Sequence, residues 1–119
     1  MIKPDFATTF AAEWIEAWNS HDLDRILSHY TDDFRFSSPF IPAIAGEPSG
    51  ILSGHKAIRE YWSKALARGP DLHFKLITLL VGVGSVVLYY SRHDGKIGAE
   101  HFEFDQDGKV IKSSAHYAK

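Results

Sequence analysis

The sequence predicts an α+β fold in which three N-terminal helices pack on one face of a strongly curved, mainly antiparallel sheet. Residues 5 to 68 contain three stretches with apolar residues at helical spacing, and residues 72 to 117 contain four β-type stretches with no helical pattern between them. Helices segregated from a run of consecutive strands are typical of this fold class, because they cover the apolar face of the sheet that the strands form.

The composition indicates one globular domain, spanning residues 1–119, with one hydrophobic core. A net charge of −2 lacks the basic footprint of a protein that binds nucleic acid or an anionic membrane. Cysteine is absent, which excludes disulfides and thiolate chemistry, and the longest apolar run, Leu79–Val83, is too short to cross a membrane. No signal-peptide pattern is present at the N-terminus. We therefore expect a cytoplasmic protein without nucleic-acid or membrane partners.

The first helix is expected from Asp5 to Asn19. Trp14 lies four residues from both Phe10 and Trp18, so the three rings share one stripe of an amphipathic helix. A second, short helix follows a cap at Asp22, and its apolar positions have the i, i+3, i+4, i+7 spacing: Leu23, Ile26, Leu27 and Tyr30.

The next segment is expected to contain a short strand, a loop and the third helix. Phe34–Ser38 alternates between apolar and polar residues, which predicts a strand that ends before Pro39. Residues 39–53 are rich in proline and glycine and are expected to form a long loop without regular structure, a type of loop that is usually functional or mobile. Ser53 is a plausible cap for a third helix through Arg68, which Gly69-Pro70 ends.

Four consecutive strands are then expected, at about 72–82, 85–93, 96–105 and 109–117. Asp94-Gly95 and Asp107-Gly108 predict hairpins between them, because glycine supplies the positive φ that a tight turn needs. With two-residue turns, counting places Tyr89 opposite Glu100 and Phe104 opposite Ile111.

In this register, side chains alternate between two faces of the sheet. The face toward the helices carries Glu100 as its single carboxylate among Val87, Tyr89, Phe102, Phe104, Ile111, Ser113, Ala115 and Tyr117. The outer face carries Leu88, Tyr90, His101, Glu103, Lys112, Ser114 and His116. The alternative is a bulge or register slip that turns Glu100 toward solvent.

An ordered set of short motifs runs through nearly the whole chain: Trp18–Asp24, Tyr30–Asp33, Gly54–Arg59, His101–Phe104 and Asp107–Val110. With these motifs the chain resembles the nuclear transport factor 2-like superfamily, in the branch that contains ketosteroid isomerases and SnoaL-like polyketide cyclases. The resemblance implies a cone-shaped, cystatin-like roll of helices and bent sheet that encloses an apolar pocket, usually in a dimer.

The resemblance also implies roles for three positions. Isomerases of this family place a carboxylate base beside a proline, where this sequence has Ser38 before Pro39. Their tyrosine that binds a developing oxyanion corresponds to Trp14, whose N–H is a weaker donor. Their protonated acid on a late strand, just before His-Phe, corresponds to Glu100, which an apolar site would keep neutral.

Glu100 and Tyr89 are the candidate catalytic residues. Desolvation is expected to raise the pKa of Glu100 so that it can act as an acid, with Tyr89 as a hydrogen-bonding helper; the alternative is a structural Tyr–Glu hydrogen bond. The candidate ligand-binding residues are Trp14, Trp18, Phe36, Ser38, Phe40, Trp62, Phe102 and Tyr117, although the tryptophans are also explained as core residues. The seven histidines show no metal-ligand spacing, so neither a metal nor another cofactor is expected.

Two functions remain open from the sequence. The first is an isomerase or lyase that performs acid–base isomerisation or cyclisation on a small apolar carbonyl compound and lacks the usual base. The second is a binding module that holds a small apolar ligand without reacting it. In either case the outer sheet face, which mixes apolar and polar residues, is expected to form a homodimer.

Overall fold

The computed structural model describes residues 1–119. Its elements, in chain order, are α1 (Pro4–Ser20), α2 (Leu23–Leu27), β1 (Tyr30–Ser37), α3 (Ile41–Ala45), β2 (Ile51–Ser53), α4 (His55–Arg68), β3 (Lys75–Val81), β4 (Ser85–Ser91), β5 (Ile97–Phe104) and β6 (Val110–Tyr117). The six strands form one sheet in the order β2-β1-β6-β5-β4-β3. All neighbouring strands are antiparallel except β1 and β6, which run parallel.

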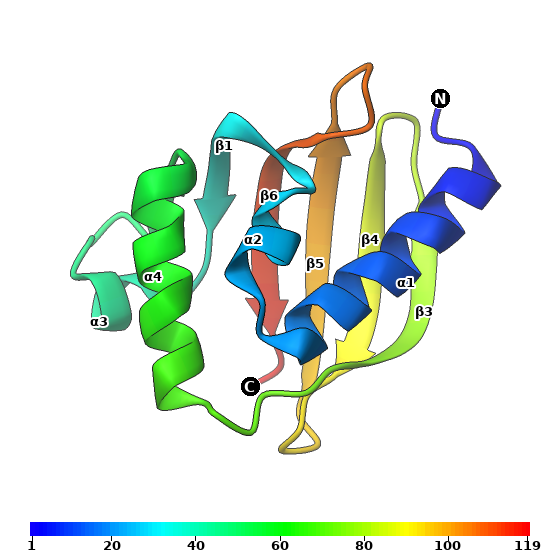
Figure 1. Ribbon diagram of the computed structural model, residues 1–119. Helices are drawn as coiled ribbons and strands as arrows, with labels where there is room; N and C mark the ends of the chain where they lie inside the picture. The colour runs from blue at the N-terminus through cyan, green and yellow to red at the C-terminus, as the bar shows by residue number, and fades with distance from the viewer.

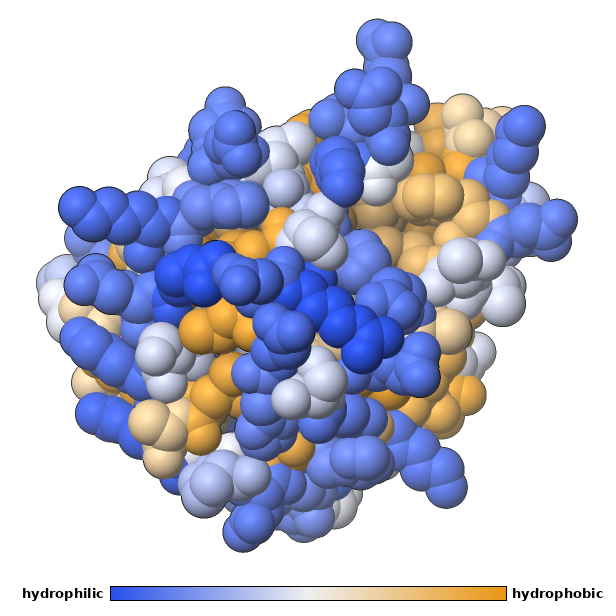
Figure 2. Space-filling view, viewed as in Figure 1, coloured by the Kyte–Doolittle hydropathy of each residue, from blue (hydrophilic) through white to orange (hydrophobic).

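The helices lie on one face of this curved sheet, which confirms the predicted α+β class. In Figure 1, α1 runs diagonally in front of β3 and β4, α2 lies in front of β6, and α4 stands beside β1. The helical face that this view presents is covered largely by hydrophilic side chains, with smaller apolar patches between them (Figure 2).

The predicted helix α1 forms with a proline in its first turn, where the missing N–H costs no hydrogen bond. His21, with φ of 62°, ends it in the left-handed region. Asp22 then caps α2 as expected, because its carboxylate accepts a hydrogen bond of 3.2 Å from the Arg25 amide. A bidentate ion pair between Arg25 and Glu13 joins α2 to α1.

The segment between α2 and α4 is more regular than predicted. Tyr30 begins β1 instead of extending α2, because it pairs with Val110 of β6. Residues 39–53 are not structureless: they contain α3 and β2, and the fully buried Ile41 anchors α3. Ser53 does not cap the following helix, since it belongs to β2 and Gly54 is the residue before α4.

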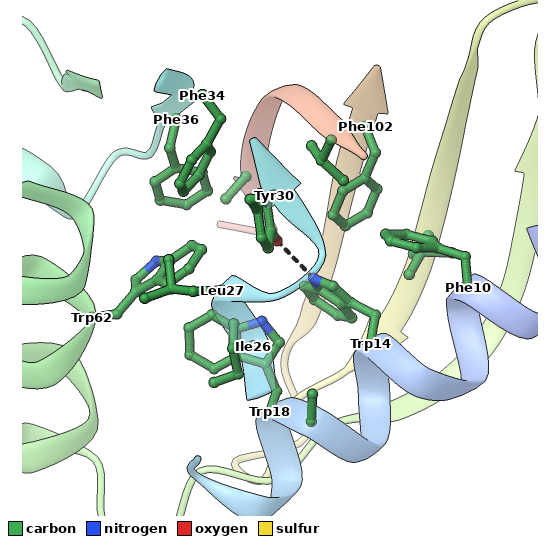
Figure 3. Packing of buried hydrophobic residues seen from close by; sticks show 14 of the residues in the cluster. Phe10, Trp14, Trp18, Ile26, Leu27, Tyr30, Phe34, Phe36, Trp62 and Phe102 are labelled. Carbon is green, nitrogen blue, oxygen red and sulfur yellow. Dashed lines mark hydrogen bonds between the residues drawn. The ribbon is translucent and has the colours of Figure 1, made fainter. Parts of the chain in front are cut away.

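The core is unusually rich in aromatic rings, which come from the helices and from the inner face of the sheet. Figure 3 shows how they meet: Phe10, Trp14 and Trp18 from α1, Ile26 and Leu27 from α2, Tyr30, Phe34 and Phe36 from β1, Trp62 from α4 and Phe102 from β5. Trp14 is central, with its ring 5.3 Å from Phe102 and 5.5 Å from Tyr90. Full burial of each large side chain stabilises the fold by roughly 1.5–3 kcal/mol.

The β4–β5 register differs from the prediction by one residue. Arg92 N–H donates to the Lys96 carbonyl across 2.8 Å, so three residues, ending with Gly95 at φ of 81°, form the turn instead of two. Leu88 therefore lies opposite Glu100, and Tyr89 lies opposite Ala99. Tyr89 and Val87 consequently point to the outer face, whereas Leu88 and Tyr90, predicted to be outside, are buried beneath the helices.

The β5–β6 turn is also one residue longer than predicted, but a bulge restores the register. Asp105 N–H donates to the Lys109 carbonyl, and Phe104 pairs with Val110 rather than with Ile111. The register then shifts by one between Glu103 and Phe104, which leaves Ile111 partly exposed. From there onward the pairs agree with the prediction, so that Glu100 lies opposite Ala115 on the inner face.

Candidate functional site

A cavity of about 330 Å³ lies between the helices and the inner face of the sheet. Of its 18 lining residues, 12 are hydrophobic, so it suits an apolar ligand. Aromatic side chains form much of its buried wall: Trp14, Trp18, Phe36, Tyr61, Trp62 and Phe74. Exposed or half-buried residues form its opening, where the end of α4, the β4–β5 turn and Phe40 come together.

Glu100 is the one carboxyl group in the buried wall of this cavity. Only 4% of the residue is exposed. Its Oε1 accepts a hydrogen bond of 3.4 Å from the Tyr90 hydroxyl, and its Oε2 accepts one of 3.3 Å from the Ser113 hydroxyl. Desolvation outweighs these two hydrogen bonds, which favour the charged form, and raises the pKa of Glu100 to about 8. Glu100 is therefore mainly a neutral acid at pH 7.

The hydroxyl groups around Glu100 also remain protonated. Desolvation raises the pKa of the Tyr30, Tyr61, Tyr90 and Tyr117 phenols, and the nearby Glu100 charge would raise them further. The Tyr30 hydroxyl accepts a hydrogen bond of 3.0 Å from Trp14 Nε1, as the dashed line in Figure 3 shows. The Tyr61 hydroxyl donates to Ser38 Oγ across 3.4 Å. This end of the cavity thus offers hydrogen-bond donors and no side chain that is a ready base.

Comparison with known families identifies the fold. A family model described as a SnoaL-like domain matches residues 11–113. The chain belongs to the SnoaL-like domain family. This places it in the nuclear transport factor 2-like superfamily, as the sequence motifs predicted.

Solved structures extend the comparison. A SnoaL-like protein of unknown function from Burkholderia thailandensis is 52% identical, with 99% of this chain and 98% of that chain covered and a TM-score of 0.94. A protein of unknown function with a cystatin-like fold from Methylobium petroleophilum is 17% identical, with 99% and 79% covered and a TM-score of 0.75. A candidate isomerase of the SnoaL-like family from Agrobacterium tumefaciens is 16% identical, with 97% and 99% covered and a TM-score of 0.77. A search of curated proteins found no match.

Most of the predicted site residues of this SnoaL-like domain lie at the cavity. The predicted residues that line it are Glu100, Trp14, Trp18, Phe36, Phe40, Trp62 and Tyr117. Ser38 and Phe102 do not line it: Ser38 lies behind the wall, where it accepts the bond from Tyr61, and Phe102 is fully buried against Trp14.

Tyr89 is the one candidate that lies on the wrong side of the sheet. It is 39% exposed on the outer face, because the three-residue turn shifts its strand by one position. Tyr90 takes the place next to Glu100 that was predicted for Tyr89. Tyr61 lines the cavity but was not predicted as a site residue, and neither was Tyr30, which bonds to Trp14 of the cavity wall.

The structure contains no group of three or more His, Cys, Asp or Glu side chains that could hold a metal ion. None of its helices combines the length and the apolar character that crossing a membrane requires.

Proposed function

We propose that this SnoaL-like domain binds a small apolar carbonyl compound in its cavity and performs acid–base isomerisation or cyclisation chemistry with Glu100 as the acid. One observation carries the proposal: a fully buried carboxyl group, with a pKa of about 8, lies in the wall of an aromatic cavity. A carboxyl group that is neutral at pH 7 can donate a hydrogen bond to a carbonyl oxygen. Tyr90 takes the role of helper that was predicted for Tyr89.

The chemistry supported by this arrangement is enolisation. As the α-C–H bond of the ligand breaks and its proton passes to water, negative charge develops on the carbonyl oxygen. The Glu100 O–H stabilises that charge strongly because the surroundings have a low dielectric constant, and it transfers its proton to the oxygen to give the enol. Glu100 then regains a proton from water. Tyr90 and Ser113 hold the carboxyl group in position throughout.

The second candidate function, a binding module, is favoured by the absence of a side-chain base near Glu100. Position 38 is serine, and the surrounding phenols have raised pKa values. Without such a base, catalysis is restricted to ligands whose α-protons are already acidic, such as 1,3-diketones. A ligand with less acidic protons would be bound and released unchanged.

The test uses benzoylacetone, an aromatic 1,3-diketone whose keto and enol forms differ in ultraviolet absorbance. Wild type is expected to accelerate tautomerisation, and Glu100→Gln is expected to lose on the order of 10²-fold of that rate, as is typical for a general acid. Glu103→Gln is the matched control, because Glu103 is on the same strand but faces outward near Lys112. Binding without acceleration would favour the binding module, and the absence of binding would overturn both functions.

We also propose that the outer sheet face pairs two copies of the chain. In its true register this face carries Val87, Tyr89, Ala99, His101 and Ser114 in the three middle strands, flanked by the exposed Leu80 of β3. A two-fold axis through this face would bury the same surface of each copy. The mixed apolar and polar character of the face supports pairing, since it is less hydrophobic than a core but more apolar than a surface that only meets water.

A further inference from the structure

Two arginines at the opening of the cavity have no carboxylate partner. Arg25 is paired with Glu13, and Arg59 is paired with Asp24, so these two arginines are neutralised locally. Arg68, the last residue of α4, and Arg92, directly before the β4–β5 turn, form no ion pair within 4.0 Å. Both of these residues line the cavity.

The Arg92 guanidinium is held in place by aromatic rings rather than by an acid. Its central carbon lies 5.0 Å from the centre of the Tyr117 ring and 5.6 Å from that of Phe40. These two rings stack on each other at 4.7 Å and both line the cavity. Cation–π contacts of this kind orient a guanidinium while its N–H groups stay available for a planar anion.

The charge at the opening is positive although the whole chain has a net charge of −2. Asp94 also lies at the opening, but its carboxylate accepts a hydrogen bond of 3.0 Å from the Lys96 amide and forms no ion pair with Arg92. Two arginines and one aspartate therefore leave a formal charge of +1 there. Desolvation raises the pKa of the Tyr90 and Tyr117 phenols, and the Arg92 charge partly offsets that rise, so its field reaches into the cavity.

We propose that Arg92 and Arg68 form an anion-binding subsite, so that the ligand of this cavity is amphipathic, with an apolar ring body inside and an anionic group at the opening. This inference rests on the proposed function, since it concerns the same cavity and names the class of its ligand. The proposal also gives the orientation of the ligand. Its anionic group contacts the arginines, and its uncharged carbonyl end contacts the neutral Glu100 in the buried wall. A purely apolar ligand would leave both guanidinium groups without a counter-ion.

The test compares two fluorescent probes that share one ring system. 1-Anilinonaphthalene-8-sulfonate carries an anionic group, and N-phenyl-1-naphthylamine is the same molecule without it. Both fluoresce more strongly in apolar surroundings, so the dissociation constant of each can be measured by titration. The ratio of the two dissociation constants reports the contribution of the sulfonate group, because both probes have the same ring system.

The variants Arg92→Gln and Arg68→Gln, alone and combined, remove the charges at the opening. The combined variant is expected to weaken binding of the sulfonate probe on the order of tenfold, as for two partly solvated charge-assisted contacts, and to leave the neutral probe within about twofold. Arg35→Gln is the matched control, because Arg35 is also unpaired but is exposed on β1, away from the cavity. Ala65→Phe, which fills the cavity from α4, is expected to displace both probes.

A second measurement needs no variant. Raising the ionic strength from about 0.01 M to about 0.1 M shortens the Debye length from about 30 Å to about 10 Å, and this should weaken only the sulfonate probe. If the neutral probe binds but neither salt nor the arginine variants change the ratio, the anion subsite is wrong and the cavity function stands. If neither probe binds to wild type, the cavity function and the subsite are both overturned.

Discussion

The ring of Tyr90 lies against the bare backbone of Gly98, and this contact brings its hydroxyl within 3.4 Å of Glu100. Tyr90 of β4 and Gly98 of β5 are opposite each other in the sheet. A Cβ at position 98 would lie 2.9 Å from atoms of the Tyr90 ring, closer than real side chains approach. Glycine is therefore required here for the space it leaves, and that space determines where the phenol meets the acid.

Gly98→Ala should push the Tyr90 ring away from β5 and break its bond to Glu100. Overpacking of a tight site typically costs about 1–3 kcal/mol, and we expect a loss of that size in the free energy of unfolding measured by urea titration. Gly84→Ala is the control, because its added Cβ would meet nothing within 4 Å. Equal stability of the two variants would show that the Tyr90 ring moves freely.

Tyr90→Phe should raise the pKa of Glu100 above its value of about 8. The hydrogen bond from Tyr90 favours the charged carboxylate, so its removal makes ionisation harder, by up to about one pKa unit for a bond worth about 1.4 kcal/mol. Tyr89→Phe should leave that pKa unchanged, because Tyr89 faces outward. Carboxyl NMR titration of both variants measures the difference. A shift in the Tyr89 variant alone would restore the register predicted from the sequence.

Glu100→Gln should change how stability depends on pH. The pKa of Glu100 rises on folding from an ordinary 4.5 to about 8, so between these values the folded state holds a proton that the unfolded state has lost. The free energy of unfolding of wild type should therefore fall by about 1.4 kcal/mol per pH unit across this window. Glutamine removes this contribution, which makes the variant relatively more stable at pH 9 than at pH 5. Parallel pH profiles for wild type and variant would mean that Glu100 is solvated.

Val87→Glu should weaken the proposed dimer. Val87 lies in the middle of the outer face, and a two-fold pairing would bring two added carboxylates into one interface, where unpaired charges are costly. Sedimentation equilibrium should show a shift toward monomer of at least tenfold in the dissociation constant, while Lys56→Glu, an exposed change on α4, should have no effect. A monomeric wild type at high protein concentration would remove the basis of this prediction.

Helical stripes and turn signals were sufficient to predict the class of fold. The stripe of α1 and the Asp22 cap are local features, so they can be recognised without knowledge of the rest of the chain. The regular structure within residues 39–53 could not be predicted in this way. There α3 depends on burial of Ile41, and β2 depends on pairing with β1, and both are tertiary interactions.

Whether a candidate residue on the sheet was placed on the correct face depended on the length of the neighbouring turn. Glu100 was placed correctly because the bulge at Ile111 compensates for the extra residue in the turn before it. No bulge follows Gly95, so the extra residue there exchanged Tyr89 for Tyr90 at the cavity side. An Asp-Gly pair predicts a turn, but it does not distinguish two residues from three, since glycine provides the positive φ in both.

The position of β6 has a consequence for synthesis on the ribosome. This strand lies between β1 and β5, although it follows both along the chain. While the ribosome still covers Val110–Tyr117, β1 has only the three-residue β2 as a neighbour and cannot join the meander of β3, β4 and β5. Until β6 is in place, the aromatic side chains of α1 and β1 lack the complete sheet against which they pack. Tyr117, which belongs to β6, is also missing from the cavity wall. This domain can therefore complete its fold only after β6 has left the ribosome, and insertion of that strand between β1 and β5 is the step that completes the sheet.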